Sequence, residues 1–332
     1  MATKTETQIN EFKINYLTEE QYQEALANNQ INDDEIYMTP KNSSVTYSLS
    51  KSGNTITLTG SDGSKSSVTY NEATTSSSGL MSASDKVKLN TIDTEVFDNA
   101  GSHNCVYRGK SLGTSVTTAQ YAEISAGTFK DMYIGDYWTI NGVVYRIAAF
   151  DYYLGIGQNS SIKCASHHVT IVPDKSLYSY SMNSGDTTTG AYYGSKMYTE
   201  GLNSAKTTIN SAFGSSHVLT HTIFLPSETS NNYVSGGRYV DNTVKLMNER
   251  NVFGCIVYGN VANGTNVPLY DDDDAMQYPL FRFRPDLAII GENYWLRDVV
   301  DGSRFVRVFA YGGVTTGSAS AEYGVRPTFS IC

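Results

Sequence analysis

The densest group of potential metal ligands is a run of aspartates, Asp271, Asp272, Asp273 and Asp274. Adjacent carboxylates repel one another, so they must be solvated or neutralised by a hard cation such as Ca²⁺. Their spacing is not that of an EF-hand loop, and alternate residues of a strand would point to opposite faces. We interpret the run first as a solvated loop and second as a Ca²⁺ site, and we expect no other cofactor.

Histidines and cysteines do not form a recognisable metal centre. His167 and His168 are adjacent, so on a strand they would face opposite ways; polar packing or a contact at an axis between chains is the better interpretation. His217 and His221 have the spacing of helical metal ligands, but the residues between them favour a strand. The cysteines lie far apart without a CxxC pair, which indicates buried or incidental thiols, with metal ligation as the minor alternative: Cys105, Cys164, Cys255 and Cys332.

Paired carboxylates are the remaining catalytic candidates. Glycosidases place two such groups on either side of the scissile bond, and Glu292 with Asp298, or Asp136 with Asp151, could form a pair in space. No motif selects either pair, and the sequence contains neither a GxSxG elbow nor a phosphate-binding glycine loop. We therefore predict a protein that is not an enzyme, with polysaccharide cleavage as the alternative.

The composition favours a surface that binds through hydrogen bonds and aromatic contact. The 332 residues include 25 Tyr and 28 Gly, and only 17% are charged, as in all-β or loop-rich proteins. A net charge of −9 without a Lys/Arg cluster argues against a nucleic-acid partner. The sequence shows no signal peptide and no membrane span, so we expect a soluble protein made in a cytoplasm.

The N-terminal part predicts a helix followed by a small sheet. Thr18 is an N-cap candidate with Glu19 and Glu20 in the first turn, and a short strand is expected through Ile36 and Met38. Apolar residues then alternate with Ser and Thr in three runs separated by glycine-containing turns, which predicts a β-meander: Val45, Tyr47, Leu49, Ile56, Leu58, Val68 and Tyr70.

The segment after the meander predicts a short helix with one apolar seam. Ser82 or Ser84 is the expected N-cap, and Leu89, Ile92 and Val96 fall on one line, as in a short coiled coil. Neither this helix nor so thin a sheet is stable alone. We therefore expect copies of the chain to associate here; docking of the helix on the chain's own C-terminal part is the alternative.

From about His103 the sequence has the density of a globular core. We expect an α+β domain with short strands and long loops. A helix should end at Gly127, a second should cover 243–251, and a hairpin should turn at Asn141-Gly142. Nothing divides this part, so we treat it as one domain.

Several sequence segments resemble known protein families. NYLTEEQYQEALANNQINDDEIYMTP, YSLSKSGNTITLTGSDGS and ATTSSSGLMSASDKVKLN are similar to shaft modules of tail fibre proteins from phages and prophages of Gram-positive, often gut, bacteria. YWLRDVV (294–300) and GVRPTFSI (324–331) resemble domains of the C-type lectin fold and its formylglycine-generating-enzyme-like relatives. This chain lacks the Glu-Pro-Asn or Gln-Pro-Asp signature of Ca²⁺-dependent sugar binding. Trp295, Arg297 and Arg326 are expected as core and strut residues, with each arginine paired with Asp298 or a carbonyl.

The resemblance implies a homotrimer in a virion. It divides the chain into a tail-attachment segment (1–40), a β-meander shaft (41–72), a trimerisation linker with a short coiled coil (73–102) and a receptor-binding domain (103–332). The expected location is the tail tip, after synthesis in the cytoplasm of the host bacterium. The expected partners are a bacterial surface receptor, glycan or protein, and other tail or baseplate proteins; a purely structural fibre is a further alternative.

The segment 301–323 is the predicted receptor-binding loop. Tyrosine rings and hydroxyls on a Gly/Ala framework resemble antibody paratopes, in which Tyr gives rigid amphipathic contact. In similar proteins this segment is a target of diversity-generating retroelements, although those targets are rich in Asn and this one has none. A plain solvated loop is the alternative. The predicted contact residues are Arg304, Phe305, Arg307, Phe309, Tyr311, Thr315, Thr316, Ser318, Ser320 and Tyr323.

Overall fold

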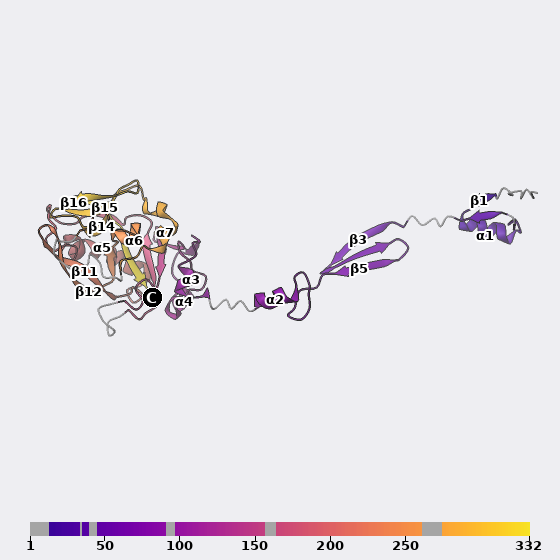
Figure 1. Cartoon of the computed structure of the whole chain (residues 1–332), viewed down its shortest axis with the longest axis horizontal. Helices are drawn as coiled ribbons and strands as arrows, with labels where there is room; N and C mark the ends of the chain where they lie inside the picture. Colours follow the sequence, from indigo (N-terminus) through magenta and orange to yellow (C-terminus); the bar gives the residue numbers. More distant parts are fainter. Residues whose placement is uncertain (1–12, 34, 40–44, 91–96, 157–163, 261–273) are drawn as a thin grey trace, which may run out of the picture. The chain divides into compact units, whose positions relative to one another are not determined.

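The structure, a computed structural model, describes residues 13–33, 35–39, 45–90, 97–156, 164–260 and 274–332. The chain is mixed α+β with several sheets and divides into two compact units, Met1–Ile92 and Asp93–Cys332 (Figure 1). The boundary lies inside the segment 73–102, the predicted trimerisation linker. Among the described residues, no helix has the length and apolar character needed to cross a membrane.

The first element group is a small β-α-β arrangement. Strands β1 (Ile14–Tyr16) and β2 (Ile36–Met38) pair in parallel on either side of helix α1 (Glu19–Ala27) in the sequence. The predicted cap is confirmed: Thr18 Oγ1 accepts the Gln21 N–H at 3.2 Å, and the Gln21 side chain accepts the Thr18 N–H at 2.9 Å.

One face of this two-stranded sheet is apolar and exposed. The rings of Tyr22 on α1 and Tyr37 on β2 are 6.0 Å apart, so the helix packs on the Tyr37 face. Successive strand residues point to opposite faces, so the remaining apolar residues share the other face. They are 45–69% exposed: Ile14, Tyr16, Ile36 and Met38.

The predicted β-meander is confirmed as an antiparallel sheet of β3 (Tyr47–Ser52), β4 (Thr55–Gly60) and β5 (Lys65–Thr69), in that order. The register pairs Leu49 with Leu58 and Ile56 with Val68. Strand alternation therefore collects Tyr47, Leu49, Ile56, Leu58 and Val68 on one face, which we call the apolar sheet face. The other face carries hydroxyl residues: Ser48, Ser50, Ser52, Thr55, Thr57, Thr59, Ser67 and Thr69.

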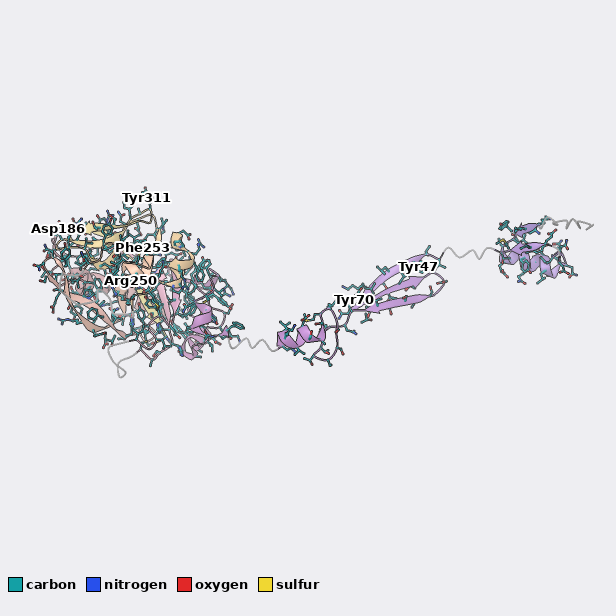
Figure 2. All side chains as sticks on the ribbon, in the orientation of Figure 1. Tyr47, Tyr70, Asp186, Arg250, Phe253 and Tyr311 are labelled. Carbon is teal, nitrogen blue, oxygen red and sulfur yellow. The ribbon has the colours of Figure 1, made fainter. Side chains whose placement is uncertain are left out.

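The apolar sheet face has no cover from the described residues of its own unit. Leu49 is 72% exposed, Tyr47 62% and Val68 56%, and every residue of β3 and β5 is exposed. Figure 2 shows Tyr47 and Tyr70 extending from this sheet. A sheet of three short strands with its apolar side in water lacks a core of its own.

Helix α2 (Ala83–Asn90) follows, with Ser82 Oγ accepting the Asp85 N–H at 3.0 Å as its cap. No residue of α2 is buried, and Leu89 is 50% exposed. Of the predicted seam only Leu89 lies within the described part of the chain; Ile92 and Val96 lie outside it. The seam therefore stays a prediction.

The second unit is built around two mixed sheets. A six-stranded sheet has the order β13-β18-β9-β8-β7-β6, and a five-stranded sheet has the order β10-β17-β14-β15-β16. The strands of the first are β6 (Ser111–Gly113), β7 (Tyr137–Ile140), β8 (Val143–Phe150), β9 (Val169–Pro173), β13 (Val244–Leu246) and β18 (Pro327–Ile331). Those of the second are β10 (Tyr178–Ser181), β14 (Tyr294–Val299), β15 (Arg304–Val308), β16 (Val314–Ser318) and β17 (Glu322–Val325).

A long hairpin and short helices complete this unit. The hairpin consists of β11 (His221–Ser230) and β12 (Tyr233–Asn242). The helices are α3 (Ala100–His103), α4 (Thr118–Ala126), η2 (Met197–Gly201), α5 (Leu202–Phe213), α6 (Glu249–Phe253), α7 (Pro279–Phe283) and η4 (Pro285–Ala288). Figure 1 shows the yellow C-terminal strands beside the orange and magenta elements that precede them by many residues.

Local turn signals hold, and one helix prediction fails. Asn141 and Gly142 turn between β7 and β8 with φ of 50° and 80°, and Gly127 caps α4, both as predicted. The helix expected over 243–251 is wrong in its first half. There β13 pairs with β18 and is buried throughout, and a helix begins only after the cap Asn248. A partner strand decides the conformation of such a short apolar run.

A buried charge network lies at the centre of the unit. Asp274 Oδ2 lies 2.5 Å from Arg297 Nη2 and 3.3 Å from Lys245 Nζ, and Lys245 donates to Tyr153 Oη at 2.6 Å. The expectation of a solvated aspartate loop or Ca²⁺ site is therefore wrong for Asp274; Asp271, Asp272 and Asp273 lie outside the described residues. The sequence predicts that Arg297 pairs with Asp298 or a carbonyl. In the structure Asp274 is an ion-pair partner of Arg297.

Candidate functional site

The segment 301–323 contains a β-hairpin and the start of a further strand rather than one loop. Arg304–Val308 pairs with Val314–Ser318 as the hairpin β15–β16, and β17 starts at Glu322. The turn 309–313 carries Phe309 and Tyr311, which are 40% and 81% exposed. In Figure 2 the Tyr311 side chain projects from the surface of the unit. The apolar residues Phe305, Val306 and Val308 were the available sign of strand β15.

Strand alternation divides the predicted contact residues between two faces. Arg307, Phe309 and Thr315 share one face of the five-stranded sheet, because Arg307 pairs with Thr315 across the hairpin. Arg304, Thr316 and Ser318 share the other, and Arg304 Nη1 lies 3.4 Å from Thr316 Oγ1. These residues therefore do not form one continuous contact surface.

Phe305 is a correction to the predicted site. Its side chain is fully buried, as are its neighbours Val306 and Val308. Both faces of β15 are thus covered at this end of the strand, so Phe305 is a core residue and cannot touch a receptor without unfolding.

The face that holds Arg307 carries a line of rings and cations. The Arg307 guanidinium carbon lies 4.4 Å from the ring centre of Tyr323 and 5.7 Å from that of Phe309, and the Phe309 and Tyr311 rings are 5.5 Å apart. Tyr323 stands directly opposite Tyr180 in the register of β10 and β17. We call Tyr180, Tyr323, Arg307, Phe309 and Tyr311 the aromatic–cation row.

The row is supported from beneath by Trp295. The Trp295 ring is fully buried, packs 4.8 Å from Tyr323, and donates its Nε1–H to the Tyr180 carbonyl at 2.9 Å. Gly317 lies over the same indole, and a Cβ there would come within 2.8 Å of the ring. These contacts hold the Tyr323 ring against the core of the unit. The prediction that Trp295 is a packed core residue is confirmed.

Two members of this surface were not predicted. Lys196, which immediately precedes η2, has its Nζ 5.1 Å from the centre of the Tyr180 ring. Tyr180 belongs to a strand far from 301–323 in sequence, and only the sheet order brings it beside Tyr323. The alternating YSYS of 178–181 was the available signal for a strand with its tyrosines on one side.

The other end of the β15–β16 hairpin is closed by loops. Ser320 donates its N–H and its hydroxyl to Asp186 Oδ1, at 3.1 Å and 2.6 Å. The hydroxyl bond lowers the pKa of Asp186. Arg304 forms an ion pair with Asp301 at 2.5 Å, and Thr188 donates to the Asp301 carbonyl. Ser320 is therefore bonded to Asp186, and Arg304 is paired with Asp301.

The other candidate carboxylates have structural partners. Asp136 is fully buried and paired with Arg108 at 2.7 Å, and the Ser176 N–H donates to Glu292. Asp298 accepts the Glu249 N–H, and burial raises its pKa well above the usual value, with Glu249 as a further cause. Asp151 pairs with His167 at 2.7 Å. Among the described residues, no group of three His, Cys, Asp or Glu side chains could hold a metal ion.

Buried neutral histidines predict a pH-dependent stability. Burial lowers the pKa of His168 and lowers that of His221 well below 6.5. The unfolded chain takes up these protons below about pH 6.5, whereas the folded chain does not, so the unfolding free energy should decrease as the pH falls. We expect a loss of up to about 1.4 kcal/mol per pH unit for each histidine.

Urea unfolding at pH 7.5 and 5.5 checks this dependence. The variant His221→Phe, which keeps a ring beside Tyr153, should show a smaller difference between the two pH values than the wild type. His217→Gln, at a partly exposed histidine, should keep the wild-type difference. An unchanged difference in His221→Phe would contradict the assignment.

Comparisons with known protein families, with curated proteins and with solved structures find no match for this chain.

Proposed function

We propose that this chain is a homotrimeric receptor-binding protein at the tip of a phage tail, and that the aromatic–cation row contacts the bacterial surface. The observation that carries the proposal is a row of rings that packs on Trp295 at Tyr323 and ends in Tyr311, which is 81% exposed. Large exposed rings with little side-chain entropy to lose are typical of binding surfaces.

Self-association is supported by the apolar sheet face. Its leucines, valine and tyrosine stay in water in the single chain, although transfer of such side chains from water is favourable by about 25 cal/mol per Å². Large exposed apolar patches mark interaction sites. In the proposed trimer three such faces pack together, and the Ser/Thr faces remain in solvent.

Tail attachment is the role we propose for the β1–α1–β2 group. Ile14, Tyr16, Ile36 and Met38 form a second uncovered apolar face. Such a face, in a group whose helix buries no residue, suits docking on another virion protein.

A C-type lectin-like fold is our finer proposal for the second unit. YWLRDV is strand β14, and GVRPTFSI runs through the end of β17 into β18. Tyr294 pairs with Gly324, so the two phrases that carry the resemblance lie side by side. Arg326 donates its Nε–H to the Pro173 carbonyl at 2.8 Å, as expected of a strut residue.

Competition for host cells tests the proposed function. Purified full-length protein should reduce phage adsorption to a susceptible strain and should leave the size distribution of wall polymers unchanged in chromatography. Release of shorter polymer would favour the depolymerase alternative. Absence of both effects would favour a purely structural fibre.

Tyr311→Ala is expected to weaken binding to cells by about tenfold or more, because the most exposed ring of the row is lost. Stability should not change, because Tyr311 is 81% exposed. Pull-down of labelled protein with cells measures the first and urea unfolding the second. Tyr258→Ala removes a tyrosine that is 42% exposed and outside the row, and should bind like the wild type. Equal binding of both variants would show that the row is not the contact surface.

A further inference from the structure

The five-stranded sheet carries three arginines, which differ in whether a carboxylate lies beside them. Arg297 is paired with Asp274, and Arg304 is paired with Asp301. Among the described residues, no carboxylate lies within 4.0 Å of Arg307. Arg307 donates its Nε–H to the Thr316 carbonyl at 2.9 Å, while its buried Nη1 has no described hydrogen-bond partner. The positive charge of this guanidinium is therefore only partly compensated by the described residues.

A second cation lies on the same face. Lys196 also has no carboxylate within 4.0 Å among the described residues, and it contacts the ring of Tyr180. Tyr180 and Tyr323 are cross-strand neighbours, so Lys196 and Arg307 flank one tyrosine pair. The nearest acid in the strand sequence, Glu322, alternates to the opposite face. A chain of net charge −9 therefore presents a local positive site among exposed rings.

We propose that the receptor group bound by the aromatic–cation row is an anion, the carboxylate or phosphate of an acidic surface polymer, held by Arg307 with Lys196 as the second cation. The guanidinium keeps its positive charge and attracts either anion, and Nη2 is the donor that is neither bonded to Thr316 nor buried. Its position between two rings reduces the flexibility that binding must remove. This inference rests on the proposed function and adds the chemical class of the ligand.

Matched variants distinguish a role of Arg307 in anion binding from a role in packing against the Tyr323 ring. Arg307→Gln removes the unpaired charge, Arg307→Lys keeps it, and Arg304→Gln removes a charge on the same strand that Asp301 already neutralises. On cell walls bound by the full-length protein, Arg307→Gln should bind about tenfold more weakly than the wild type and lose most of the salt dependence. Arg307→Lys should bind at an intermediate level, and Arg304→Gln should remain within about twofold of the wild type. Unfolding monitored by tryptophan fluorescence confirms that each variant is folded.

Chemical neutralisation of the wall identifies the anion. Amidation of wall carboxylates and removal of phosphate polymers with hydrofluoric acid are applied to separate samples. Wild-type binding should fall to the level of Arg307→Gln on one of these walls, and Arg307→Gln should show no further loss there. Undiminished wild-type binding to both treated walls, or equal binding by Arg307→Gln and Arg304→Gln, would overturn the inference and leave the proposed function intact. Failure of the wild type to bind any wall would overturn both.

Discussion

Substitution of Leu49 and Leu58 with Ser should convert the proposed trimer into single chains. The two leucines are paired across β3 and β4 at the centre of the apolar sheet face and are 72% and 40% exposed in one chain. Three copies would bury six such side chains, each contributing about 1.5–3 kcal/mol when fully buried. Light scattering should change from three times the 36.4 kDa of one chain to the mass of one chain.

The opposite face of the same sheet provides the control. Ser50 and Thr57 are paired in the same strands, and substitution of both with Ala should leave the trimer intact. Loss of trimers in both double variants would indicate general unfolding of the sheet. A wild-type chain that is monomeric in dilute solution would contradict the proposed architecture.

Asp274→Asn should destabilise the second unit by about 3–5 kcal/mol, because it leaves Arg297 and Lys245 buried without the carboxylate that pairs with both. Burial already lowers the pKa of Lys245 to about 8, and the Asp274 charge is what opposes this shift. Without that charge Lys245 should lose its proton near neutral pH. Urea unfolding followed by tryptophan fluorescence measures the effect, because both tryptophans, Trp138 and Trp295, lie in this unit.

An exposed Asp–Arg pair provides the comparison for Asp274. Asp286 pairs with Arg284 at 2.6 Å, and its side chain is 56% exposed. Asp286→Asn should change the unfolding free energy by at most about 1 kcal/mol, because solvent screens the pair. A similar small effect in Asp274→Asn would show that the buried network does not stabilise the unit.

Elements defined by neighbouring residues could be predicted from the sequence. The Thr18 cap, the Asn141-Gly142 turn and the end of α4 at Gly127 each depend on hydrogen bonds or dihedral angles within a few residues. The alternation from Tyr47 to Thr69 likewise sets the two faces of the first sheet, because the side-chain period of a strand is two.

The proposed binding surface was only partly predictable. The tyrosines and Arg307 of 301–323 were identified from residue type, but residue type could not show that Phe305 is buried. Burial depends on what covers both faces of β15, which residues distant in the sequence decide.

Residue types and their order were sufficient to predict the short-range structure and an aromatic, hydroxyl-rich composition. The tertiary structure alone decided that Tyr180 and Lys196 join Tyr323 and Arg307, and that Asp274 is a buried partner of Arg297. Strand order and burial arise from contacts between segments that are far apart in the sequence, by 23 residues for Asp274 and Arg297 and by 115 for Tyr180 and Trp295. Local patterns of residue type do not specify which segments meet.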